Sequence, residues 1–374
     1  MNQPDSPKPR RIAVILFNLG GPDSREAIEP FLFNFFMDRN IIRLPRPFRF
    51  LLAKLISKRR SRREAGVSYG EIGSRSPLLE NSRAQAEALE TCLNSRSPQD
   101  TVYECRVSMR YWHPMAEAVA ADVQSGDGDP DEIVLLPLYP QFSTTTTRSS
   151  LQEWAKAYAH HGMKAPHRAV CCYPWQDGFV QAATDLVAEK FEQALRKARA
   201  ENLNPPRLLF SAHGLPENII KDGDPYQWQC TETAKAVAMA VQNRLDLGVL
   251  DWSECYQSRV GPQKWIGPST EEALEHAARD QVPVVLFPHA FVNEHVETLV
   301  ELDVEYRELS EKLGVPFYER VATVGTHEAF IDGLAAMVEN ARPGRLSADT
   351  GGRICPKAFR CCSMADSDLA GKLG

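Results

Sequence analysis

Residues 282–306 read VPVVLFPHAFVNEHVETLVELDVEY. The stretch opens with a short apolar run, passes through a loop that contains Pro288, and ends in acidic residues at helical spacing. Apolar residues on both faces of a short run, followed by helical periodicity, are typical of a buried parallel strand and its crossover helix. This unit predicts an α/β fold.

The same pattern recurs along the chain. Strand-like runs occur in RIAVILFNLGGP, YECRVSMRYW, EIVLLPLYP and HRAVCCYP before about residue 175, and in RLLFSAHGLP, VPVVLFPHAF and the weaker VPFYERVA after it. Long helical patterns such as residues 178–201 separate them. We predict two Rossmann-like, doubly wound domains with parallel sheets, at residues 11–175 and 176–341. Residues 1–10 form an extension, and residues 342–374 a tail that contains cysteines.

Composition limits the class of protein. The 374 residues are 43% hydrophobic and 25% charged, which is typical of a globular protein with room for two domains. The net charge of −6 argues against a nucleic-acid-binding surface. No run of about 18 apolar residues and no signal-peptide pattern is present, so we expect a cytoplasmic protein.

The unusual side chains follow the predicted strands, where open parallel sheets bind ligands. His213 ends one strand in FSAHGLP. A lone histidine is more often structural, so its functional interpretation depends on a second group. Tyr111, Trp112, Trp265 and Phe291, with Tyr69, would line a flat apolar pocket. Arg110 would anchor an anionic group there.

Glu297, Glu301 and Glu305 form one stripe on the helix that leaves the strand of residues 284–287. Residues four apart drift by about 40° per step on an α-helix, and a slightly wider helix would align them better. A solvated acidic face is the alternative. No Lys or Arg lies within the stripe, however, and crowded carboxylates raise one another's pKa. The stripe therefore indicates a path for protons or a divalent cation.

Two further segments stand out. Residues 43–63 combine nine Arg and Lys residues with apolar side chains, which predicts either a membrane-surface helix or an ordinary docked helix.

Cys355, Cys361 and Cys362 lie close together in the sequence, which favours metal ligation in a reducing compartment. A fourth ligand would come from Cys171, Cys172 or Cys230; free thiols are the alternative.

The sequence resembles the ferrochelatase family from about Ile12 to Val338. The shared motifs are LFNLGGP, YGEIGSRSPL, MRYWHP, LYPQFSTTTT, FSAHGLP, CYQSRVGPQKWIGPST and FVNEHVETLVELDVEYRE, in the family's order. The resemblance implies a chelatase-like fold with the active-site cleft between its domains. The implied reaction inserts the substrate Fe²⁺ into protoporphyrin IX, gives protohaem and releases two protons, in the last step of haem synthesis.

The resemblance also implies roles for particular residues. His213 would take protons from the pyrrole nitrogens or bind iron, with Glu297 as its partner. Glu301, Glu305 and His295 would form the proton or metal path. The substrate-binding positions would be Leu19, Tyr69, Arg110, Tyr111, Trp265 and Phe291. Residues 43–63 would form a lip that contacts the inner face of a membrane peripherally.

Some relatives hold a [2Fe–2S] cluster with three C-terminal cysteines and one internal cysteine. Animal forms place the internal cysteine where this chain has Thr144, and the spacing of the C-terminal cysteines also differs. The resemblance therefore implies a cluster on Cys355, Cys361 and Cys362, for which Cys172 is the internal candidate. Alternatives to the implied reaction are insertion into coproporphyrin, insertion of another metal, and a carrier of haem or porphyrin without catalysis.

Overall fold

The computed structural model describes residues 8–64, 75–125, 128–259, 263–341 and 346–365, and the strands within these ranges form two parallel sheets. The first sheet has the order β2-β1-β3-β4-β9, and the second has the order β6-β5-β7-β8. The strands of the first sheet are β1 (Arg10–Asn18), β2 (Thr101–Met109), β3 (Glu132–Pro137), β4 (His167–Val170) and β9 (Leu346–Ser347). Those of the second are β5 (Arg207–His213), β6 (Trp252–Gln257), β7 (Val284–Phe287) and β8 (Tyr318–Arg320).

All seven predicted runs form strands, and the predicted α/β fold with two Rossmann-like, doubly wound units is confirmed. The sequence did not predict β6 and β9, which are edge strands. The first half of β6 is only half-buried, so it lacks the continuous apolar run of a central strand. β9 has two residues and pairs with β4. The domain boundaries near residues 175 and 341 stay predictions.

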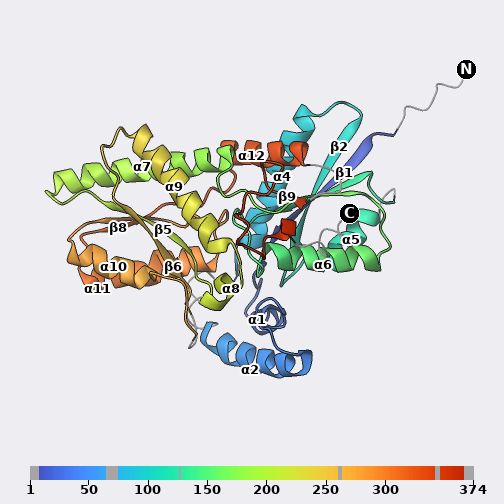
Figure 1. Cartoon of the computed structure of the whole chain (residues 1–374), viewed down its shortest axis with the longest axis horizontal. Coiled ribbons are helices and arrows are strands. Elements are labelled where there is room, and N and C mark those ends of the chain that lie inside the picture. The colour runs from blue at the N-terminus through green and yellow to red at the C-terminus, as the bar shows by residue number, and fades with distance from the viewer. Residues whose placement is uncertain (1–7, 65–74, 126–127, 260–262, 342–345, 366–374) are drawn as a thin grey trace, which may run out of the picture.

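Helices cover both sheets in three groups (Figure 1). The helices are α1 (Ile28–Phe36), α2 (Arg46–Glu64), α4 (Leu78–Arg96), α5 (Ala116–Gln124), α6 (Thr147–His160), α7 (Asp177–Ala200), α8 (Glu217–Lys221), α9 (Tyr226–Arg244), α10 (Thr270–Arg279), α11 (Tyr306–Leu313), α12 (Glu328–Asn340), the π-helix η1 (Glu297–Glu305) and the 3₁₀-helix η2 (Ser363–Ala365). The helices α4, α7, α9 and α12 lie on one side of both sheets, α5 and α6 on the other side of the first, and α10 and α11 on the other side of the second.

Alternate residues of β1 show how the layers form. Val14 and Leu16 pack into the core cluster that contains α4, α7, α9 and α12, whereas Ala13, Ile15 and Phe17 face α5 and α6. A parallel strand buried on both faces therefore needs apolar residues at consecutive positions.

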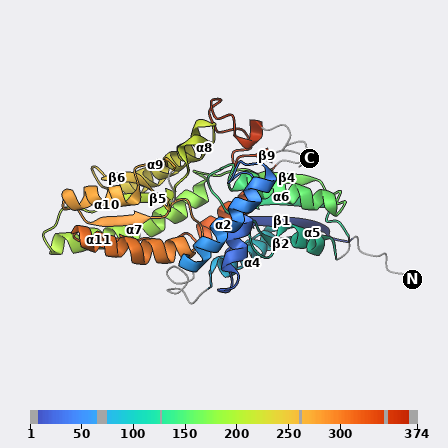
Figure 2. The ribbon, with the colours of Figure 1, turned by 90° about the horizontal axis from the view of Figure 1, so that it is seen from below.

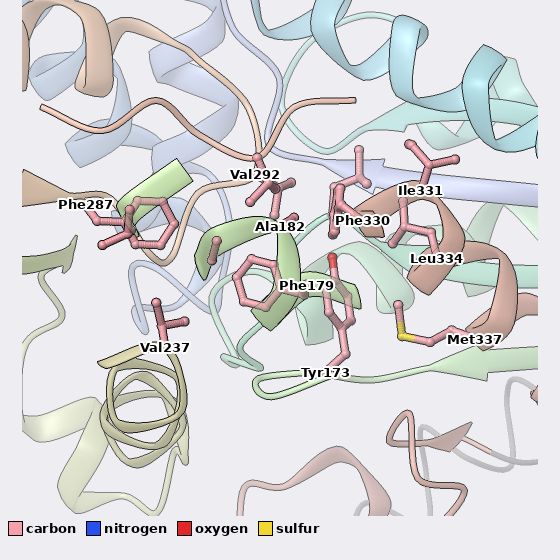
Figure 3. Close-up of a cluster of buried hydrophobic side chains, with 14 of the residues drawn as sticks. Tyr173, Phe179, Ala182, Val237, Phe287, Val292, Phe330, Ile331, Leu334 and Met337 are labelled. Atoms are coloured by element: carbon pink, nitrogen blue, oxygen red, sulfur yellow. The ribbon is translucent and has the colours of Figure 1, made fainter. Parts of the chain in front are cut away.

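One core joins the two sheets. Figure 3 shows Phe179 of α7 beside Phe330 of α12, with Phe287 at the end of β7 on one side of them, and the two ring centroids lie 5.9 Å apart. Polar contacts add to this junction, because Asn18 Nδ2, at the end of β1, donates to Asn293 Oδ1 in the loop after β7 (3.0 Å). The carboxyl ends of strands from both sheets thus meet at the junction.

The segment of α1 and α2 extends from the body of the molecule on the same side as α8 (Figure 1), and Figure 2 views α2 from below. Arg43, just before α2, forms an ion pair with Asp222 at the end of α8. Among the described helices, none is both long enough and apolar enough to cross a membrane.

Candidate active site

His213 and Glu297 come together at this junction. His213 is the last residue of β5, and Glu297 is the first of η1. The Nδ1 atom of His213 lies 2.9 Å from Glu297 Oε2, and the two side chains are 35% and 33% exposed. The pair is therefore partly desolvated and remains open to a ligand. The structure thus brings together His213 and Glu297, the two residues that the family resemblance implies to be the base and its partner.

The helix that contains the acidic stripe is a π-helix along its nine residues, Glu297–Glu305. Its turns are wider than those of an α-helix, which reduces the drift between residues four apart, and such helices are frequent at functional sites. Ser258 Oγ lies 2.5 Å from Glu301 Oε2 and 3.5 Å from Glu297 Oε2, so both carboxylates face the same side. Glu305 is exposed. The stripe thus leads from His213 toward solvent.

Glu301 has an unusually complete set of donors. Ser258 N–H and Gln257 Nε2 donate to its carboxylate at 2.8 and 3.0 Å, and Tyr306 OH lies 3.2 Å from Oε1. Ser258 has a φ of +61°, which is uncommon for a residue other than glycine. The strand-end sequence gave no signal for this conformation, and neither Ser258 nor Gln257 was predicted as a site residue.

The pKa values of the neighbouring carboxyl groups of Glu297 and Glu301 are shifted in opposite directions. Burial acts to raise the pKa of Glu297, but the charge and hydrogen bond of His213 outweigh it and lower that pKa to about 2. Burial, followed by the charge on Glu297, raises the pKa of Glu301. Burial acts to lower the pKa of His213, but the charge on Glu297 outweighs it and raises that pKa. Groups whose pKa values are driven apart can divide acid and base roles between them.

Two acidic residues of the same segment have a different role. Arg320 in β8 pairs with Glu294 Oε1 at 2.8 Å and with both oxygens of Asp303 at 2.7 Å. Burial acts to raise the pKa of Glu294, but the charge on Arg320 outweighs it and lowers that pKa. Since Glu294 and Asp303 are neutralised in this way, only Glu297, Glu301 and Glu305 remain as the acidic stripe.

His295 lies beside the pair. Its Nδ1 accepts the backbone N–H of Glu297 at 3.0 Å, and its ring stands edge-on to Phe291 with centroids 4.5 Å apart. Burial lowers the pKa of His295. The ring therefore holds the first turn of η1 in place.

The predicted pocket residues Leu19, Arg110 and Tyr111 follow β1 and β2, where the backbone N–H groups of Arg110 and Tyr111 donate to Asn18 O and Leu19 O at 2.8 and 3.0 Å. Arg110 Nη2 lies 3.0 Å from Asp38 Oδ2 and its Nε 2.6 Å from Ser149 Oγ, while its guanidinium lies 4.7 Å from the Tyr111 ring centroid. An anionic group of a substrate that binds Arg110 would thus share its guanidinium with the carboxylate of Asp38. Leu19 packs in the apolar cluster of α1 that contains Tyr111. Tyr69 lies outside the described residues.

Trp265 and Arg60 complete the surroundings of the pair. Trp265 forms an isolated β-bridge with Pro216, in the loop that follows His213. A Cβ atom added at Gly214 would lie 3.4 Å from the Trp265 ring. The same Cβ would lie 2.9 Å from Gln257 O, so this position requires glycine. The charge of Arg60 in α2 lowers the pKa of both His213 and Glu297, though less than their other neighbours act on them. Arg60 belongs to the predicted lip, and no sequence pattern indicates that it lies near the pair.

Three of the four predicted cluster cysteines converge. Gln229 Nε2 donates to Cys172 Sγ at 3.4 Å and to Cys355 Sγ at 3.2 Å, and Cys355 is also hydrogen-bonded to the free thiol of Cys362. Hydrogen bonds from Cys172 and Cys362 lower the pKa of Cys355, and hydrogen bonds within the same group of thiols raise the pKa values of Cys172 and Cys362. Cys361 Sγ instead donates to Asp222 O at 3.2 Å.

Two other internal cysteines were candidates for the fourth ligand. Cys171 Sγ lies 3.4 Å from Cys172 Sγ, next to the convergent thiols. Cys230 is fully buried in the cluster that contains Tyr226. Thr144 donates through both N–H and Oγ1 to Asp224 Oδ2 at 2.7 Å, so its side chain is already used.

Comparison with known proteins identifies the family of this chain. The sequence model of the ferrochelatase family matches residues 11–342. The chain is 47% identical to a ferrochelatase of Hyphomonas neptunium over 96% of each chain, and 47% identical to one of Caulobacter vibrioides over 94% of this chain and 97% of that one. It is 48% identical to one of Wolbachia from Drosophila simulans over 88% of this chain and 98% of the relative. The chain therefore belongs to the ferrochelatase family.

Proposed function

We propose that this chain inserts Fe²⁺ into protoporphyrin IX, with His213 as the base and Glu297 as its ionised partner. The observation that carries the proposal is the 2.9 Å contact between His213 Nδ1 and Glu297 Oε2, at the start of an acidic π-helix. Imidazole and carboxylate also suit a ferrous ion that is being transferred. Family membership supports the chemistry of metal insertion into a porphyrin.

The reaction explains why these groups stand together. The lone pairs and two N–H protons of a flat porphyrin lie in the ring plane, so binding energy must bend the ring before the metal can enter. Two protons leave as Fe²⁺ enters, which requires a base and an exit route. Glu297 stabilises the imidazolium of His213. Glu301 has the raised pKa needed to accept and release a proton, and the exposed Glu305 passes it to water.

Comparison of two porphyrins tests the choice of substrate. Anaerobic insertion of Fe²⁺, followed by absorbance, is expected to give a higher kcat/KM with protoporphyrin IX than with coproporphyrin, because the exposed apolar side chains of the lip favour a lipophilic porphyrin. Zn²⁺ serves as an oxidation-resistant control metal. A preference for coproporphyrin would change the assigned substrate and leave the roles of His213 and Glu297 intact.

We also propose a [2Fe–2S] cluster on Cys172, Cys355 and Cys362. The thiols fit this group, because the three converge and Gln229 donates N–H bonds to two of them. Bound there, a cluster supplies one-electron redox chemistry. The fourth ligand is Cys361, as the family pattern implies, or Cys171, which lies beside Cys172.

The cysteine variants have a spectroscopic readout. Cys172→Ser or Cys355→Ser is expected to abolish the visible charge-transfer absorption and the bound iron and sulfide, because the cluster normally needs four protein ligands. Cys92→Ser is the control, since Cys92 contacts Asp332 and none of these thiols. Comparing Cys361→Ser with Cys171→Ser identifies the fourth ligand. Unchanged spectra in Cys172→Ser would rule out this ligand set.

The exposed side chains of the predicted lip support a peripheral membrane contact. Leu44, Phe48, Phe50, Leu51 and Leu55 are large, apolar and exposed, and Arg and Lys residues are interspersed among them. Substituting Ser for Phe48, Leu51 and Leu55 together is expected to reduce co-sedimentation with anionic vesicles at least tenfold, since each residue loses its apolar contact. Val249→Ser is the control, because Val249 is exposed elsewhere. Equal sedimentation would favour the ordinary docked helix.

A further inference from the structure

Outside the active site, a group of side chains of the types that can ligate metals lies where α5 and α6 approach each other. Glu117 is in the first turn of α5, His160 is the last residue of α6, and His161 follows it. Glu117 Oε1 lies 2.5 Å from His160 Nδ1 and 2.9 Å from His161 Nε2. Among the described residues, this is the group of His, Cys, Asp and Glu whose ligand atoms all lie within 4.8 Å of one another.

His161 lies close to Glu117 but does not have the alignment of a good hydrogen bond. His161 Nε2 is shielded from water and has no correctly oriented hydrogen-bond partner, although it is only 2.9 Å from the carboxylate oxygen. A nitrogen placed in this way can direct its lone pair at a cation held between the two groups. His160 is on the exposed side, so an ion can approach from solvent.

The ligand types indicate a transition metal. Imidazole suits zinc, copper, iron and nickel, whereas magnesium and calcium prefer a set made of oxygen atoms alone. Two histidines and one carboxylate, with the remaining position left to water, form a known zinc set. Ligand atoms about 2.0–2.1 Å from a tetrahedral ion lie roughly 3.3 Å apart, so each histidine has to withdraw from Glu117 by less than about 1 Å.

The local backbone favours a cation at this place. His160 and His161 stand at the C-terminal end of α6, where the helix dipole is negative. Gln124 Nε2, at the end of α5, donates to His161 O at 3.3 Å and to Asp129 Oδ1 at 3.0 Å, and so fixes the backbone of His161. The charged neighbour in the preceding turn of α6, Lys156, pairs with Glu153.

The position is well separated from the active site. Ser149, near the start of α6, contacts Arg110, and the helical rise of about 1.5 Å per residue places His160 roughly 17 Å farther along. An ion at Glu117 would therefore not be in contact with a porphyrin bound near His213.

We propose that Glu117, His160 and His161 bind one divalent transition-metal ion and thereby link α5 to α6. The site is auxiliary to metal insertion, because the residues that carry that chemistry lie elsewhere.

Equilibrium dialysis of the full chain against Zn²⁺ tests the proposal. Both the parent and the variant carry His213→Ala, which removes one potential metal ligand of the active site. The His160→Ala/His161→Ala double variant is expected to bind a single Zn²⁺ fewer than its parent, and Zn²⁺ is expected to raise the Tm of the parent by more than that of the double variant. His276→Ala is the matched control, since His276 is an exposed histidine in the last turn of α10.

Glu117→Gln provides a second variant that keeps the shape of the side chain. It is expected to weaken Zn²⁺ binding at this site at least tenfold, because a neutral amide replaces the anionic ligand. All three surface variants should retain iron insertion in the otherwise unchanged protein. If the double variant and Glu117→Gln both bind as much Zn²⁺ as their parents, with the same affinity, the cluster is only a set of surface contacts and the proposal is wrong.

Discussion

Replacing Glu297 with Gln is expected to lower kcat for iron insertion by about 10²- to 10⁴-fold, the usual contribution of a positioned acid–base group. The amide has the same shape as the carboxylate but cannot neutralise the imidazolium of His213, which lies 2.9 Å away. Porphyrin binding, measured by fluorescence quenching, should change little because the aromatic pocket is intact. A carrier without catalysis would instead keep its binding and show no insertion in the wild type either.

His213→Ala should cause a loss of kcat of similar size, and the double variant should be little worse than either single variant, because the effects of residues that act as a unit are not additive.

The single variant Glu297→Gln also changes the pH profile. The carboxylate raises the pKa of His213, and a base must be neutral to accept a proton, so activity rises with pH through that pKa. Removing the charge moves this limb of the profile to lower pH. An unchanged limb would show that His213 is not the base.

The second large effect concerns stability. Arg320→Ala is expected to lower the free energy of unfolding by about 3–5 kcal/mol, because it leaves two partly buried carboxylates without their shared cation. Arg320 is 11% exposed and pairs with Glu294 and with both oxygens of Asp303. Urea denaturation measures the change. Arg196→Ala is the control: its pair with Glu192 is exposed and should be worth less than about 1 kcal/mol.

The sign of the pH dependence gives a further check on Arg320. The pKa of Glu294 is lowered in the folded chain, so this pair stabilises the protein above the ordinary pKa of a glutamate and loses its effect as pH falls. The stability difference between wild type and Arg320→Ala should therefore shrink toward low pH. A difference no larger than that of the Arg196 control at neutral pH would mean that water replaces the cation, and that Arg320 does not hold η1 in place.

The sequence was sufficient to predict the central strands, because the run of apolar residues that marks each strand is a local pattern. In β1 and β7, consecutive apolar residues face helices on both sides, and this can be read directly from residues 284–287. His213 was located by its place at a strand end, and the stripe of Glu297, Glu301 and Glu305 by its spacing. Their assignment as partners came from the family motifs, since no local pattern links residues 84 positions apart.

The tertiary structure decided which charges are paired. From the sequence, five acidic residues between Glu294 and Glu305 look alike, and only packing against β8 brings Arg320 to Glu294 and Asp303. Likewise, the turn after β6 gives Ser258 its left-handed backbone and directs two donors at Glu301. The fold also separates Cys361 from Cys362, its neighbour in sequence. Periodicity determines which face of a strand or helix is buried, whereas charge neutralisation depends on distances between distant segments, which only the packed chain fixes.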